Sequence, residues 1–123
     1  MERPKLGLIV REPYASYIVD GRKTWELRKR KARHRGPLGI VTRGQLIGQA
    51  DLVGMEGPFT VEELLPHFAK HLAEEEFLRA YAQGEPLYAW VLANAFRYEK
   101  PLYVPRRPGR VMFVDLTETF EKG

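Results

Sequence analysis

The residues best suited to chemistry lie in one short segment, residues 21–28, which reads GRKTWELR. Its pattern predicts a strand, and side chains on a strand alternate between two faces. Thr24, Glu26 and Arg28 are then expected on one polar face. Lys23 lies at the junction before the strand, where alternation is less regular, so its long side chain could reach the same space. The segment thus predicts one group of cations and a carboxylate.

Such a group has two interpretations. In a concave site, a lysine, a carboxylate and an arginine reduce one another's desolvation cost and offer donors and an acceptor to a base edge. A lysine close to Arg28 could also have a lowered pKa and act as a base or nucleophile. The alternative is a surface strand with solvated ion pairs, each of which contributes little.

The first half of the chain contains the elements that must position this group. Leu6 to Val10 reads as a buried strand, and Glu12-Pro13 then opens a helix, with proline in the first turn. Asp20-Gly21 ends that helix, because glycine readily adopts the left-handed conformation after a last turn. On the strand that follows, Trp25 is expected in the core. Residues 28–36 are predicted to form a polar loop.

The second half predicts further strands around one helical region. Two strands, 38–42 and 45–53, are joined at Arg43-Gly44. A capping box, Thr60 to Glu63, starts a helical region that runs to about Ala82, and Pro66 is expected to kink or divide it. The segments 87–93, 96–104 and 110–116 read as strands. Helices do not alternate regularly with strands, so we expect an α+β fold: a small, mostly antiparallel barrel of about six strands with two or three flanking helices.

Composition limits the classes of function. The 123 residues suit a single domain, 1–123. No apolar run approaches the roughly 18 to 20 residues that span a bilayer, and the N-terminus lacks a signal-peptide pattern, so we expect a cytoplasmic protein without a membrane partner. Cysteine is absent, which excludes disulfides and thiolate sites. His67 and His71 have helical spacing but no third ligand, so a surface helix is expected, with no metal and no cofactor.

Charge is unevenly distributed. Residues 1–50 carry 12 Lys and Arg against 4 Asp and Glu, whereas residues 51–100 carry 4 against 9. A basic half beside an acidic middle predicts one positive face, which is typical of a protein that binds a polyanion. Two basic clusters are expected to contact a nucleic-acid backbone. They consist of Lys29, Arg30, Lys31, Arg33 and Arg35, and of Arg106, Arg107 and Arg110.

Several motifs together resemble the ASCH family of the PUA-like superfamily. The hallmark G-x-K-x-x-E-x-R is present as Gly21, Lys23, Glu26 and Arg28. A segment similar to the family's Q-P-W/Y-A precedes it at residues 12–15, with glutamate in place of glutamine. An aromatic strand of the form Y-x-W-x-L-x-N follows at residues 88–94, and residues 44–54 resemble the family's central hairpin strand. The resemblance covers nearly the whole chain, in the expected order.

The resemblance implies a six-stranded PUA-like barrel with a cleft beside the motif, and a role related to RNA. Some bacterial relatives are amidohydrolases that remove the acetyl group of N4-acetylcytidine, using the motif lysine, a threonine three residues later and a further glutamate. Lys23 matches the lysine, whereas Glu26 stands at the threonine position. Several residues are conceivable counterparts of the further glutamate: Glu74, Glu75, Glu76 and Glu85.

Three hypotheses follow. In the first, the chain is a module that binds RNA or a nucleoside through Lys23, Glu26 and Arg28, together with Arg11, Thr24 and a pocket-facing Tyr14. In the second, it is a metal-independent amidohydrolase that acts on an acylated nucleoside, with Lys23 as base or nucleophile and Glu26 shuttling a proton. In the third, the acidic helical segment Glu62 to Glu85 binds a protein partner, whose identity the sequence does not indicate.

Overall fold

The computed structural model describes residues 2–105, 109 and 111–122. Six strands form its centre: β1 (Leu6–Ile9), β2 (Trp25–Arg28), β3 (Gly36–Thr42), β4 (Gln45–Phe59), β5 (Leu87–Tyr103) and β6 (Phe113–Asp115). Five short α-helices and a 3₁₀ turn surround them: α1 (Tyr14–Val19), α2 (Val61–Leu64), η1 (Leu65–His67), α3 (Phe68–His71), α4 (Glu75–Ala82) and α5 (Thr117–Lys122). The expected α+β class is therefore confirmed.

All six strands join one mixed sheet. The order is β2-β5-β4-β3-β1-β6, and every neighbouring pair is antiparallel except the parallel pair β1–β3. The expectation of a closed barrel is wrong, because the sheet has two free edges in the described residues, β2 and β6. Both sides of β1 are already paired, one with β3 and one with β6, so no backbone edge remains there for β2.

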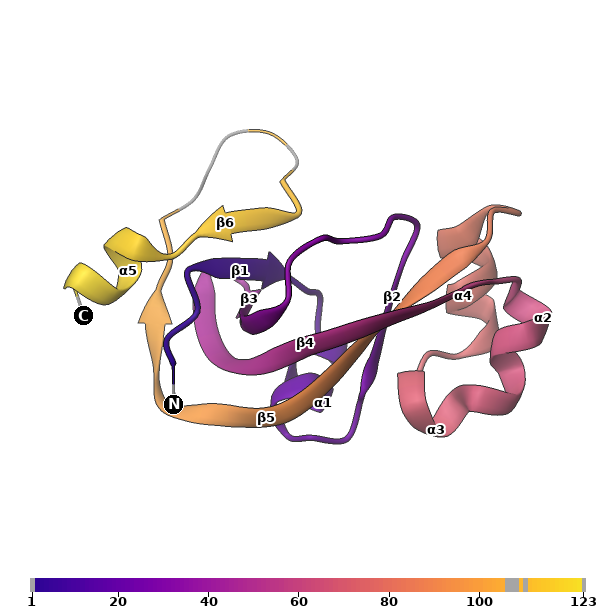
Figure 1. The fold of residues 1–123 in the computed structure, drawn as a ribbon, viewed down its shortest axis with the longest axis horizontal. Helices are drawn as coiled ribbons and strands as arrows, with labels where there is room; N and C mark the ends of the chain where they lie inside the picture. Colours follow the sequence, from indigo (N-terminus) through magenta and orange to yellow (C-terminus); the bar gives the residue numbers. More distant parts are fainter. Residues whose placement is uncertain (1, 106–108, 110, 123) are drawn as a thin grey trace.

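Two long strands determine the shape of the molecule. The strands β4 and β5 pair along most of their length, with several register shifts between them. Figure 1 shows that the two strands bend together. The expectation of two strands between residues 87 and 104 is wrong. Asn94 adopts a positive φ of 54° there and donates to Asp51 at 3.0 Å, so the chain bulges and pairing then resumes.

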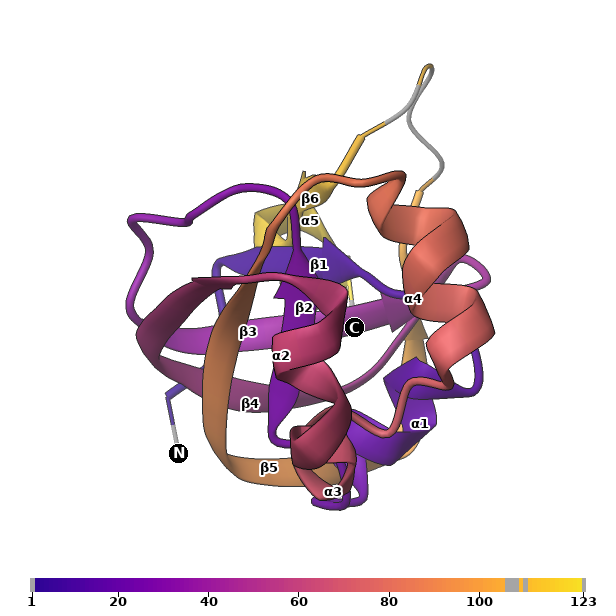
Figure 2. The ribbon, with the colours of Figure 1, turned by 90° about the vertical axis from the view of Figure 1, so that its right-hand side faces the viewer.

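The helices α2, α3 and α4 lie between β4 and β5 in the sequence and together at one end of the sheet (Figures 1 and 2). The segment leaves and rejoins the sheet at one point, because Phe59 and Leu87 are register partners. The predicted capping box of Thr60 and Glu63 is confirmed, and Pro66 lies in the 3₁₀ turn that separates α2 from α3.

The helix α1 packs on the sheet and leads directly into β2. Gly21 has a φ of 79°, which confirms the predicted helix end. The amides of Arg22 and Lys23 both donate to the carbonyl of Tyr17, so the chain turns back sharply after the helix. Two further regions differ from expectation. A strand was expected at residues 110–116, but among the described residues 111–116 only Phe113–Asp115 is a strand. The helix α5 was not predicted.

Three hydrophobic clusters form the core of the described residues. The largest joins the sheet to α1 through residues such as Leu8, Ile18 and Trp90. The second joins Trp25 and Leu27 to the helices α2 and α4. The predicted core position of Trp25 is thus confirmed. No helix among the described residues is both long enough and apolar enough to cross a lipid bilayer.

Two glycines of β4 provide a test of the packing between α1 and the sheet. A methyl group at Gly48 would collide with the Phe96 carbonyl oxygen and would lie 2.7 Å from Val19 Cγ1, whereas one at Gly54 would meet nothing within 4 Å. We expect Gly48→Ala to lower the free energy of unfolding in urea by about 1–3 kcal/mol. The matched Gly54→Ala variant should change it by less than about 0.5 kcal/mol. Equal stability of the two variants would contradict this packing.

Candidate functional site

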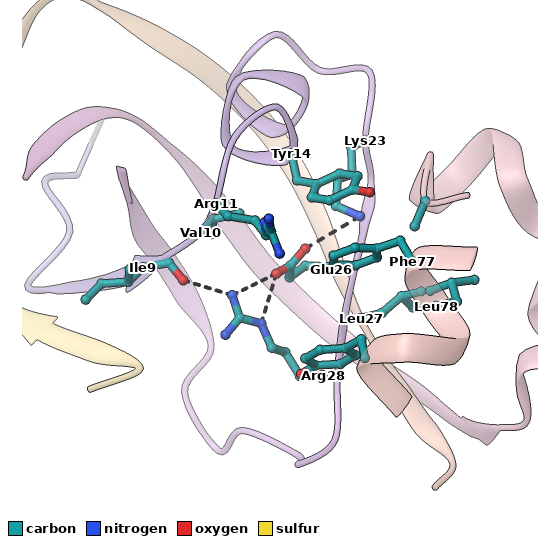
Figure 3. Close-up of a pocket in the computed structure, with 12 residues that line it drawn as sticks. Ile9, Val10, Arg11, Tyr14, Lys23, Glu26, Leu27, Arg28, Phe77 and Leu78 are labelled. Carbon is teal, nitrogen blue, oxygen red and sulfur yellow. Dashed lines mark hydrogen bonds and ion pairs between the residues drawn. The ribbon is translucent and has the colours of Figure 1, made fainter. Parts of the chain in front are cut away.

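The strand β2 is one edge of the sheet and carries two of the hallmark residues, Glu26 and Arg28. Its residues Glu26 and Arg28 pair with Trp90 and Tyr88 of β5, and strand alternation directs both polar side chains to the same face. Lys23 precedes the strand, and its ammonium reaches the same space (Figure 3). The predicted convergence of these three charged groups is therefore present in the structure.

Glu26 lies at the centre of a buried charged group. Its carboxylate accepts a hydrogen bond from Arg28 Nε at 2.9 Å. It also forms ion pairs with Arg28 Nη2 at 2.8 Å and with Lys23 Nζ at 3.5 Å. Lys23 is 3% exposed and Glu26 is 7% exposed, so the solvated-strand interpretation does not describe this site. We name Lys23, Glu26 and Arg28 the charged triad.

Backbone carbonyls complete the bonding of the triad. Arg28 Nη2 donates to the carbonyl of Ile9 at 2.9 Å, which connects β2 to the end of β1 where their backbones do not pair. Lys23 Nζ donates to the carbonyl of His71 at the end of α3. Burial lowers the pKa of Lys23, the nearby Arg28 lowers it further, and Glu26 opposes both effects.

The triad forms the polar side of a pocket of about 330 Å³. The helix α4 contributes a largely apolar wall, formed by Phe77, Leu78 and Tyr81. Figure 3 shows the Phe77 ring directed toward the triad. Tyr14 lies 5.0 Å from the Phe77 ring, and the guanidinium of Arg11 lies 5.4 Å above that ring. Burial raises the pKa of the Tyr14 hydroxyl, so this ring is neutral at physiological pH.

The expected ligand-binding residues divide into two groups. Arg11 and Tyr14 line the pocket together with the triad. Thr24 does not: it is exposed, because it precedes β2 and its backbone is held by Lys70 and Leu92 rather than by strand pairing. None of the conceivable additional glutamates lines the pocket: Glu74, Glu75, Glu76 and Glu85.

The first basic cluster follows the triad in the loop between β2 and β3. Arg30, Lys31, Arg33 and Arg35 are exposed there, and Lys29 is partly buried beside Glu85 at 3.2 Å. The indole of Trp90 donates to the carbonyl of Arg30 at 2.8 Å, which holds the loop against the sheet. The second cluster, Arg106, Arg107 and Arg110, lies outside the described residues.

The aromatic wall was not predicted from the sequence. Phe77 and Tyr81 lie four residues apart on α4, so their spacing places them on one helix face. The sequence suggested this segment, Glu62 to Glu85, only as an acidic surface for a protein partner. The spacing indicates a shared face, but only the tertiary structure directs that face toward β2. Part of the acidic charge is also paired, since Arg79 binds both Glu62 and Glu75.

His71 is bonded to Ala73, one of the residues that line the pocket. It is fully buried, so the expectation that it lies on a helix surface is wrong. Its Nδ1 accepts from the Ala73 amide at 3.0 Å and its Nε2 lies 2.9 Å from the Leu64 carbonyl, which fixes a neutral tautomer with the proton on Nε2. The ring of His67 instead lies 5.1 Å from the ring of Trp25, in a tilted arrangement. Among the described residues, no cluster of three or more His, Cys, Asp or Glu could hold a metal.

The bonding of His71 leads to a pH prediction. Burial lowers the pKa of His71 from the ordinary 6.5, and Lys23 and His67 lower it further. The unfolded chain therefore binds a proton more tightly than the folded one, and stability should fall as the pH drops below about 6.5. We expect the free energy of unfolding to decrease there in the wild type and in His67→Gln, but less steeply in His71→Gln. Parallel curves for wild type and His71→Gln would contradict this assignment.

Comparisons with known proteins support the fold and identify the family. A search of curated protein sequences finds no match. The crystal structure of ASCH from Zymomonas mobilis is similar at 21% identity, with a TM-score of 0.78 over 98% of this chain and 94% of that one. A tyrosine-to-phenylalanine mutant of the same Zymomonas mobilis protein gives 23% identity and a TM-score of 0.76 over 97% and 96% of the two chains. The model of the ASCH domain matches residues 8–102, and this chain therefore belongs to the ASCH domain family.

Proposed function

We propose that this protein binds RNA or a nucleoside in the pocket beside the charged triad, as part of RNA metabolism in the cytoplasm. The observation that supports the proposal most directly is that one pocket unites an aromatic wall with a buried polar edge. A base has an apolar face and a polar edge, so both surfaces would be used. The volume of about 330 Å³ is near the lower end of ligand pockets, which suits a single nucleoside.

The triad would read the edge of the base. Glu26 is held by both cations, so its carboxylate keeps one orientation without a ligand. Arg28 uses Nε and Nη2 within the protein, which leaves Nη1 as a donor for a carbonyl of the ligand. Three cations and one carboxylate line the pocket, so acceptor-rich edges and phosphates are favoured. The exposed residues of the basic loop would contact the RNA backbone.

Binding of a fluorescent single-stranded RNA tests this proposal. Affinity should fall by on the order of tenfold between low and physiological salt, because phosphate contacts release counterions. Tyr14→Leu should weaken binding by on the order of tenfold, since it removes a stacking surface. Tyr103→Leu is the matched control, because Tyr103 is a highly exposed ring outside the pocket, and it should bind as the wild type does. Binding that ignores salt, or equal effects of the two substitutions, would count against the proposal.

A second candidate function is an amidohydrolase that acts on N4-acetylcytidine or a similar acylated nucleoside. The observation in its favour is Lys23, whose buried ammonium borders the pocket and whose pKa is lowered. A neutral lysine is a competent base or nucleophile, and Glu26 lies close enough to exchange a proton with it.

Incubation with N4-acetylcytidine tests the second candidate. If it is correct, cytidine accumulates, and Lys23→Met abolishes the reaction because methionine keeps the length of the side chain but carries no amine. Lys70→Met is the matched control, since Lys70 lies over Trp25 and outside the pocket. Absence of cytidine, or full activity of Lys23→Met, would exclude this mechanism.

A further inference from the structure

The aromatic wall of the pocket forms a continuous row of rings. The Tyr14 ring lies 5.0 Å from Phe77, and Phe77 lies 6.1 Å from Tyr81 with their planes only 3° apart. Phe77 and Tyr81 are on successive turns of α4, so the row follows the helix axis. The row therefore offers more than one flat surface to a ligand that enters the pocket.

A cation accompanies each ring of this row. Lys23 Nζ lies 5.1 Å from the Tyr14 ring, Arg11 lies 5.4 Å from Phe77, and Lys29 lies 5.5 Å from Tyr81. The row then meets the basic loop, because Lys29 follows the triad directly in the sequence. Alternating rings and cations are typical of surfaces that track single-stranded nucleic acid, with bases on the rings and phosphates beside the cations.

Lys29 is the cation of the row best placed to exchange its partner for a phosphate. It pairs with Glu85 at 3.2 Å, and the carboxylate is largely exposed. An ion pair in such a position contributes little to stability. A phosphate could therefore replace Glu85 at Lys29 at low cost, whereas the buried cation Lys23 is held by Glu26 and the His71 carbonyl.

Building on the proposed function, we infer that Tyr81 and Lys29, at the end of the row beyond Phe77, form an outer subsite for the nucleotide next to the one in the pocket. The ligand is then single-stranded RNA of at least two nucleotides rather than a free nucleoside. A base in the pocket lies between α4 and the strands β1 and β2, so it must be unpaired and unstacked from its neighbours. The neighbouring base would use the ring of Tyr81 while its phosphate contacts Lys29.

Calorimetry with matched probes tests the outer subsite. Adenosine, cytidine and uridine are each compared with the corresponding tetranucleotide. The tetranucleotide of the preferred base should bind about tenfold more tightly than its nucleoside, because a second base stacks. Lys29→Ala should weaken binding of the tetranucleotide several-fold and reduce the slope of log affinity against log salt by about one, without affecting the nucleoside.

Glu85→Gln provides the opposite change. It frees Lys29 from its carboxylate, so it should strengthen tetranucleotide binding and leave the nucleoside unaffected. Lys70→Ala is the matched control for both, because Lys70 also lies over a ring, Trp25, but outside the pocket. It should change neither affinity.

The possible outcomes separate the two proposals. Equal affinity for nucleoside and tetranucleotide would overturn the outer subsite and leave the pocket as a nucleoside site. Equal affinity for the tetranucleotide and a blunt-ended RNA duplex would also overturn it, since stacking of unpaired bases would then play no part. Binding of neither nucleoside nor tetranucleotide would overturn both the outer subsite and the proposed function.

Discussion

The buried carboxylate of Glu26 is the constraint on which the rest of the site depends. A charge removed from water is tolerated only when opposite charges and hydrogen bonds compensate for the lost solvation. Here the compensation comes from three places: Lys23 before β2, Arg28 at the end of β2, and the carbonyls of Ile9 and His71 that bind these cations in turn. The triad therefore connects the edge of the sheet, the end of β1 and the helical segment in one bonded unit.

This bonded unit also explains how an open sheet can support a well-defined pocket. The strands β1 and β2 approach each other without pairing, and the guanidinium of Arg28 crosses between them. The space that remains is closed on its far side by α4 and not by a further strand. Where a closed barrel would place backbone hydrogen bonds, this fold therefore has a cavity lined by charged and aromatic side chains.

Local patterns predicted much of this, because local physics determines those features. Strand alternation placed Glu26 and Arg28 on one face and Trp25 in the core, and a capping box marked the start of α2. Long-range contacts decided the rest. The edge of the sheet, the bulge at Asn94, the burial of His71 and the direction of the Phe77 side chain all depend on partners far away in the sequence. Periodicity indicates which residues share a face, but not what that face meets.

The pairing of Phe59 with Leu87 has a consequence for how the pocket is encoded in the sequence. The two residues are register partners, so the segment between them begins and ends at one place on an otherwise continuous pair of strands. That segment supplies the aromatic wall, whereas β2 and its flanks supply the charges. The rings that this segment contributes, Phe77 and Tyr81, can therefore change without altering the side chains of the charged triad, provided that the His71 carbonyl that binds Lys23 is kept. In this architecture, the apolar wall and the charged side of the pocket are encoded in separate stretches of sequence.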